Sequence, residues 1–224
     1  QSCLLARRLA GAGVPYIQVN WSQYVEAMTP NCDFGWDTHI FNFDLLPDRH
    51  GPIFDRVYAA LLDDLRDRGM LDSTLVVAMG EFGRTPGPLN HLDGRDHYNP
   101  CFPALFAGAG VHGGRVLGAT DKDGAKCIET GWRHKEQPRI ENVVATMYSA
   151  LGIDWTREVR NTPSGRAYVY VDPLGANGQG AVVDLGARDP RQVVDADLVA
   201  GERPNHLDRD FGIGPAGEGG DGVR

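Results

Sequence analysis

The sequence has no apolar run close to the roughly 20 residues that a membrane-spanning helix requires. Its N-terminus also lacks the basic and then apolar segments of a secretory signal peptide. None of the four cysteines is spaced as C-x-x-C, which gives no support to a thiolate zinc site or a thioredoxin-like motif. We therefore predict no transmembrane segment, and we expect Cys3, Cys32, Cys101 and Cys127 to be small buried side chains.

Basic residues are also scarce. Lys and Arg total 22 against 30 Asp and Glu, which gives a formal net charge of -8. A net acidic surface does not attract nucleic acid or an anionic membrane, so we expect neither as a partner. The first residues, from Gln1 to Leu9, read as the middle of an amphipathic helix, so we take the chain to be a fragment of a longer protein.

The chain alternates segments with helical and with strand periodicity. Apolar residues recur every fourth position between Pro52 and Arg68, which predicts a surface helix, and Gly69 suits its C-terminal cap. The continuous apolar run at 74–79 then predicts an interior parallel strand covered on both faces. Helix, short turn and buried strand form the repeating unit of a doubly wound α/β fold.

Other segments follow the same alternation: an opening helix that ends at 11–13, strands at 14–19 and 102–107, a helix at 140–151 closed by Gly152, and an edge strand at 167–171. We predict one α/β domain over residues 1–174 and a largely irregular tail, rich in Gly, Asp and Pro, over residues 175–224. Ligands of open α/β sheets bind beyond the carboxyl ends of the strands, so the loop at 80–100 is the expected place of a site.

Pairs of potential ligands lie in the predicted loops: Asp37 with His39, Glu81 with Arg84, and Asp96 with His97. Carboxylate oxygen and imidazole nitrogen together suit Zn or Mn and, with more oxygen ligands, Mg or Ca. Glu81 is the more telling position, because it follows a strand expected to end at the ligand-bearing rim of the sheet. An isolated acid or histidine in a loop is more often a capping or surface residue, so each pair alone is weak evidence.

The arginines of the same loop have two interpretations. The planar guanidinium of Arg84 or Arg95 matches the geometry of a phosphate or sulfate group, which favours substrate binding. Alternatively, Arg84 forms an ion pair with Glu81 and both are scaffolding. Thr85 is followed by Pro86 rather than by a helix, so its expected role is turn structure rather than nucleophilic attack. The other histidines are expected at the surface or in loops: His50, His91, His112, His134 and His206.

These motifs resemble those of a known bacterial family. The resemblance rests on the segments Gly35-Trp36-Asp37-Thr38-His39, Gly80-Glu81-Phe82-Gly83-Arg84-Thr85-Pro86 and Gly94-Arg95-Asp96-His97. Together with weaker matches over about residues 3–173, they are similar to the family known as domain of unknown function 1501. That family is assigned to the alkaline phosphatase-like superfamily, which includes sulfatases and phosphatases. The resemblance implies a three-layer α/β sandwich with a mixed, mostly parallel sheet, of which this chain is the C-terminal part.

The resemblance also implies a ligand set. Asp37 and His39 resemble an Asp-and-His loop of the superfamily, Glu81 stands where a strand-end Asp would be, and His97 resembles the last His. Phe82 departs from the pattern, because it replaces the second ligand of the strand-end pair, and Asp37 and His39 are unusually close together. Alternatively, Asp96 and His97 are themselves the strand-end pair.

The expected function follows from this resemblance. It is metal-dependent hydrolysis of phosphate or sulfate esters, with a small-molecule or carbohydrate ester as substrate and Zn, Mn, Mg or Ca as the metal. The nucleophile and an early Asp are expected upstream of Gln1, and many family members are exported, which implies a periplasmic or secreted location. The rival interpretation is a catalytically inactive, exported binding or scaffold protein that retains the fold.

Overall fold

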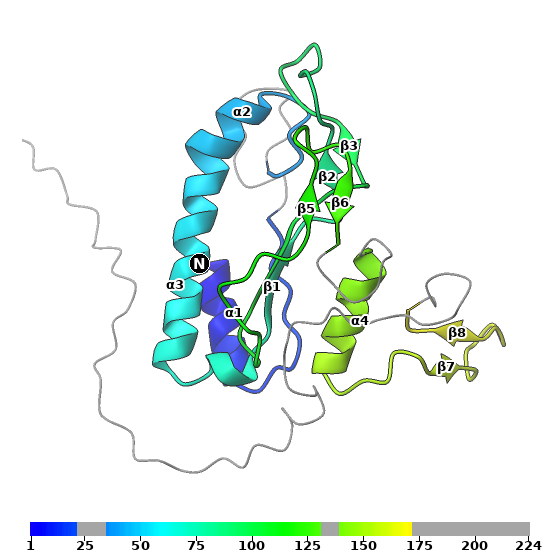
Figure 1. The fold of residues 1–224 in the computed structure, drawn as a ribbon. Coiled ribbons are helices and arrows are strands. Elements are labelled where there is room, and N and C mark those ends of the chain that lie inside the picture. The colour runs from blue at the N-terminus through cyan, green and yellow to red at the C-terminus, as the bar shows by residue number, and fades with distance from the viewer. Residues whose placement is uncertain (22–34, 131–138, 172–224) are drawn as a thin grey trace, which may run out of the picture.

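The computed structural model describes residues 1–21, 35–130 and 139–171, which form helices and short antiparallel strand pairs (Figure 1). The helices are α1 (Ser2–Gly11), α2 (Asn42–Leu45), α3 (Gly51–Asp67) and α4 (Ile140–Ala150), with a π-helical turn at Leu46–His50 that joins α2 to α3 and a 3-10 turn at Leu71–Ser73. The strands are β1 (Val76–Met79), β2 (Gly83–Arg84), β3 (His97–Tyr98), β4 (Ala104–Ala107), β5 (Ala119–Thr120), β6 (Cys127–Glu129), β7 (Glu158–Val159) and β8 (Tyr168–Val169).

Helix α3 confirms the strongest helical pattern of the sequence. Pro52 stands in its first turn, directly after the π-helical turn. The helix ends before Gly69, whose φ of 66° lies in the left-handed region that glycine adopts without strain. Leu65 is buried on its inner face, and Asp64 accepts an ion pair from Arg7 of α1 at 2.6 Å, which fixes the two helices side by side.

The predicted strands at 74–79 and 102–107 are present as β1 and β4. They pair antiparallel, with Val76 opposite Ala107 and Met79 opposite Ala104. A parallel partner would require a crossover connection, whereas the loop between β1 and β4 returns the chain to the same end without a helix. The described residues contain only antiparallel pairs, so a mostly parallel three-layer sheet stays a prediction.

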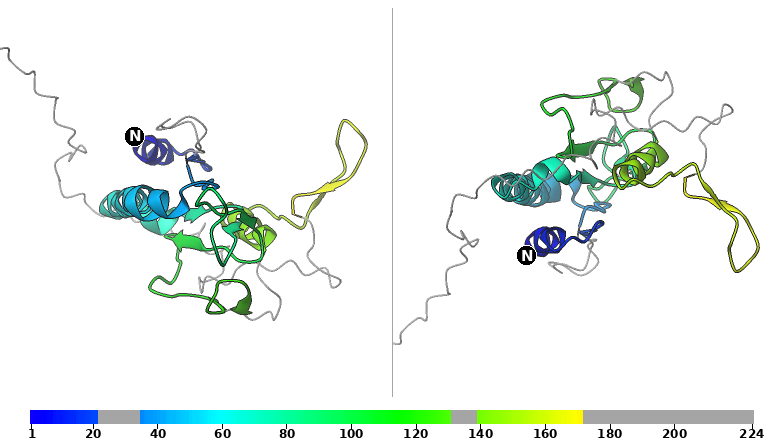
Figure 2. Two further views of the ribbon diagram at one scale, coloured as in Figure 1. Left: turned by 90° about the horizontal axis from the view of Figure 1, so that it is seen from above. Right: turned by 90° about the horizontal axis from the view of Figure 1, so that it is seen from below.

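Two expectations about strands differ from the structure. The side chains of β1 are half-buried rather than covered on both faces, and β4 is its sole strand neighbour among the described residues. Residues 14–19 run without strand pairing in the described part of the chain, although a strand was predicted there. The β1–β4 pair lies between α3 and α4 (Figures 1 and 2), which places helices on two sides of it.

Helix α4 confirms the predicted helix at 140–151, and Gly152 follows it with a φ of 72°. Its buried face carries Val143 and Ala145. The predicted strand at 167–171 is present as β8, which pairs with β7 in a hairpin that projects away from the helices (Figure 2). A ring contact between Tyr148 of α4 and Tyr170, with centroids 5.5 Å apart, anchors this hairpin.

Several predictions concern isolated features. None of the helices in the described ranges is long and apolar enough to cross a membrane. Cys3, Cys101 and Cys127 are free thiols and half-buried rather than buried, while Cys32 lies outside the described residues. The predicted irregular tail from residue 175 onward also lies outside them.

The prediction that His50 lies at the surface or in a loop is wrong. Its side chain is buried at the junction of the π-helical turn and α3, with ring centroids 5.3 Å from Trp21 and 5.5 Å from Trp36. Within the described part of the chain, neither ring nitrogen forms a hydrogen bond of standard geometry. His91 and His112 are exposed as predicted, whereas the two remaining histidines of that group, His134 and His206, lie outside the described residues.

The burial of His50 predicts a pH-dependent stability. Loss of hydration lowers the pKa of its imidazole below the ordinary 6.5; the nearby backbone of Gly35 opposes this lowering and the charge of Arg49 adds to it. The unfolded chain therefore binds the proton more readily than the folded one, so this contribution to stability is complete above pH 6.5 and is lost as the pH falls through the lowered pKa.

We expect the free energy of unfolding, measured by urea denaturation at several pH values below neutral, to fall less steeply with decreasing pH in H50F than in the wild type. The comparison cancels the titration of all other groups. Equal slopes in the two proteins would show that His50 titrates alike in the folded and unfolded chains.

Candidate functional site

Two loops that are distant in sequence form one framework. The backbone N–H of Arg95 donates to the carbonyl of Thr38 at 3.0 Å, and the N–H of Phe41 donates to the carbonyl of Leu92 at 3.1 Å. The loop that follows β1 is thereby fixed against the segment that precedes α2. Side chains from both loops consequently lie close together, as the predicted position of the site requires.

The short β2–β3 pair orders the second loop further. Arg84 stands opposite His97 in its antiparallel register. One residue further, the N–H of Thr85 donates to the carbonyl of Asp96 at 2.9 Å, and the Thr85 hydroxyl accepts from the N–H of Asp96 at 3.1 Å. These bonds extend the β2–β3 pair by one residue, and the turn role predicted for Thr85 stays a prediction.

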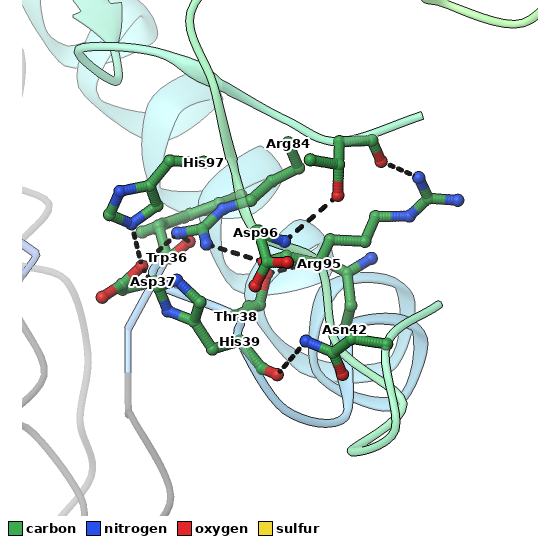
Figure 3. A network of polar contacts seen from close by, with 11 residues as sticks. Trp36, Asp37, Thr38, His39, Asn42, Arg84, Arg95, Asp96 and His97 are labelled. Atoms are coloured by element: carbon green, nitrogen blue, oxygen red, sulfur yellow. Dashed lines mark hydrogen bonds and ion pairs between the residues drawn. The ribbon is translucent and has the colours of Figure 1, made fainter. Parts of the chain in front are cut away.

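Asp37, His39 and His97 converge at this framework (Figure 3). His97 Nε2 lies 3.0 Å and His39 Nδ1 lies 3.1 Å from the same carboxylate oxygen, Asp37 Oδ1. One potential ligand atom from each residue lies within 4.8 Å of the other two. Two imidazole nitrogens and one carboxylate oxygen therefore form a group that is able to hold a metal ion.

The group is accessible from solvent. The side chains of Asp37 and His97 are 41% and 48% exposed. Partial burial by itself would raise the pKa of the Asp37 carboxyl, but hydrogen bonds from Arg84 and His97 and the charges of Arg84 and His39 outweigh it and lower that pKa. Asp37 is therefore held in the charged form that metal coordination requires.

Arg84 is bonded to this group rather than free in the loop. Its Nη2 donates to Asp37 Oδ1 at 2.5 Å and to the carbonyl of Trp36 at 2.9 Å, while its Nη1 donates to the carbonyl of Arg95 at 3.0 Å. The alternative ion pair between Arg84 and Glu81 is not found among the described residues.

Arg95 has a comparable attachment to its own loop. Its Nη1 donates to the carbonyl of Thr85 and its Nη2 to the carbonyl of Gly87, the latter at 2.8 Å. The guanidinium also lies over the ring of Phe43, 5.3 Å from the centroid. Both arginines predicted to bind substrate thus bind protein carbonyl groups, and their contact with a substrate stays a prediction.

Glu81 and Asp96, the other two predicted ligands, are exposed and do not belong to the three-residue group. Their assignment as ligands stays a prediction. The ring of Phe82 packs against the ring of His97, with centroids 4.2 Å apart. Phe82 therefore contacts one of the three residues of the group.

Asn90 is a framework residue that the sequence reasoning missed. Its side-chain amide donates to the carbonyl of His39 at 3.1 Å, and its side-chain oxygen accepts from the N–H of Gly94 at 3.0 Å. An Asn that precedes an Asp-Gly pair within four residues is typical of a side chain that closes a turn, and this signal was available.

Residues 1–177 match a family model described as protein of unknown function (DUF1501). The chain belongs to the DUF1501 family. The matched range agrees with the extent of the resemblance in the sequence, and it includes every residue of the candidate site. No curated protein matches the chain, and no solved structure does. Family membership is therefore established without an activity attached to it.

The framework predicts that Gly94 is intolerant of a side chain. Gly94 is buried, and a Cβ atom there would overlap the backbone carbonyl of His39, which Asn90 holds in place. We expect G94A to lower the free energy of unfolding by about 1–3 kcal/mol, the range for overpacking. The control is G113A, because a Cβ at Gly113 meets nothing within 4 Å, and its expected change is within about 0.5 kcal/mol. Urea denaturation of both variants tests this, and equal stabilities would contradict the close approach.

Proposed function

We propose that this protein is a metal-dependent hydrolase of phosphate or sulfate esters. The observation that carries the proposal is the convergence of Asp37, His39 and His97, since Asp37 and His97 are 60 positions apart in the sequence. Asp37 and His39 are close simply because they are two positions apart, whereas the contact of Asp37 with His97 requires the tertiary fold. A solvent-accessible cluster of this type, with the pKa of its carboxyl lowered, is a candidate for function.

The donor set fits a transition metal ion better than Mg or Ca. Asp37, His39 and His97 would hold it through two nitrogens and one oxygen, whereas Mg and Ca prefer ligand sets made of oxygen. Three protein ligands leave a coordination position open, as in catalytic rather than structural zinc sites. We therefore propose Zn or Mn from the metals considered. When bound, the ion would act as a Lewis acid that polarises an ester oxygen.

The residues of the chain would support this chemistry in distinct ways. Asp37 would bring a carboxylate oxygen to the metal, and His39 and His97 would each bring an imidazole nitrogen. The ring of Phe82 packs on His97 and restricts its rotation. Asn90 holds the backbone of His39. The exposure of Asp37 and His97 leaves room for a small-molecule or carbohydrate ester to approach.

The proposal includes the relationship to the alkaline phosphatase-like superfamily. It is supported by the order of the ligands, with an Asp-and-His segment early and a further His after a strand and its loop. This relationship would imply a mostly parallel sheet and an export route to the periplasm or the exterior.

A second candidate is a binding or scaffold protein that retains the fold without catalysis. One observation favours it: Asp37 Oδ1 already contacts Arg84, His39 and His97, so the cluster is also a self-consistent ion-pair network. The two candidates differ in whether the cluster binds metal and whether the protein turns over an ester.

We expect the purified protein to contain a transition metal by elemental analysis and to hydrolyse an aryl phosphate or an aryl sulfate. Chelation should abolish turnover, and Zn or Mn should restore it where Mg or Ca does not. D37N should lower metal affinity beyond the about 10–100-fold that loss of an outer-shell partner costs. D63N is the control, because Asp63 lies on α3 with its side chain 59% exposed and touches no residue of the site.

The variants E81Q and D96N separate the alternative ligand assignments. The geometry predicts unchanged metal affinity for both, because neither residue joins the group. If either variant lost its metal, the substituted residue would be a metal ligand after all. A metal-free wild type without turnover on both esters would rule out the hydrolase and favour the binding protein.

A further inference from the structure

We propose that Arg84 is a positioning residue of the candidate site, which holds Asp37 in its ligand pose and joins the two loops that carry the ligands. The inference rests on the proposed function, because it assigns Arg84 a role in metal binding. The main role of Arg84 is then to contact the protein, not the substrate.

The guanidinium of Arg84 donates hydrogen bonds to three acceptors in two loops. Two of them, the carbonyl of Trp36 and the carboxylate of Asp37, belong to the loop that bears His39. The third, the carbonyl of Arg95, belongs to the loop that bears His97. One guanidinium thus connects both halves of the ligand set, and Figure 3 shows it between them.

The backbone and the side chain of Arg84 are both held in place. Arg84 begins in β2, opposite His97, so its backbone is fixed relative to one ligand by the strand pair. Its side chain is 18% exposed, less than any of the three ligand side chains. The planar fork reaches acceptors in different directions, which a lysine ammonium at the end of a flexible chain does not reproduce.

Arg84 orients the carboxylate of Asp37. The Asp37 side chain is 41% exposed. Its other ion-pair partners among the described residues are His39 and His97, which would turn to the metal when it binds. Carboxylate ligands in metal sites are usually held by such an outer hydrogen bond, which orients them before the ion arrives. Without Arg84 the carboxylate would have to be ordered by the metal itself, and affinity would fall.

The test compares Zn²⁺ affinity, measured by competition with a chromogenic chelator, in the wild type, R84M and R84K. We expect R84M to bind Zn²⁺ about 10–100-fold more weakly, the usual cost of removing an outer-shell partner. R84K should recover only part of the loss, because it keeps the charge but not the fork. R66M is the matched control: Arg66 lies on α3, 65% exposed and paired with Asp63, and its loss should change nothing.

Two readouts separate positioning from general stability. The absorption spectrum of bound Co²⁺ should change in R84M, since the pose of a ligand has changed, and stay the same in R66M. In the D37N background R84M should cost much less affinity than in the wild type, because the effect passes through Asp37. Additive losses would overturn the inference.

The outcomes also distinguish this inference from the proposed function. If the wild type binds neither Zn²⁺ nor Mn²⁺, both fail. If the wild type binds Zn²⁺ and R84M binds it equally well, Arg84 has no positioning role, although the metal site stands. Tighter binding by R84M would overturn the inference as well, because it would mean that the arginine acts chiefly as a competing positive charge.

Discussion

The site depends on the hydrogen bonds that join the loop before α2 to the loop after β1. The carbonyl of Thr38 and the N–H of Phe41 are engaged by the segment around Arg95 and Leu92, so the two loops have one relative position. Gly94 makes the approach sterically possible, since any side chain there would meet the backbone of the other loop. Without these backbone contacts His39 and His97 would belong to separate, independently moving segments.

Within that framework, one carboxylate oxygen is the point of convergence. Asp37 Oδ1 receives Arg84 and both histidines, and this concentration of donors keeps the carboxyl charged despite its partial burial. The same arrangement explains why the cluster has two interpretations. An anion beside a guanidinium and two imidazoles forms an ion-pair network. The metal site proposed above would require the imidazoles to turn their nitrogens to a cation.

The arrangement changes the roles of the loop residues that the sequence singled out. Arg84, predicted to grip an ester oxyanion, binds the ligand loop, and Phe82, a departure from the expected pattern, supports His97. Family membership is established by the match to DUF1501, whereas the relationship to alkaline phosphatases concerns a sheet that the described residues do not contain. The chemistry of the site therefore rests on its geometry rather than on a related enzyme.

The sequence by itself determined the local elements and the candidate ligands. Helices α3 and α4 follow from apolar periodicity and their terminal glycines, and β1 and β4 from short apolar runs, because these signals depend on neighbours in the chain. Loop position also marked Asp37, His39 and His97 as ligand types. Only the tertiary structure decided that these three residues converge while Glu81 and Asp96 stay outside the group. It also decided that His50 is buried and that Arg84 contacts Asp37 rather than Glu81. Those outcomes depend on contacts between residues far apart in the sequence, which no local pattern encodes.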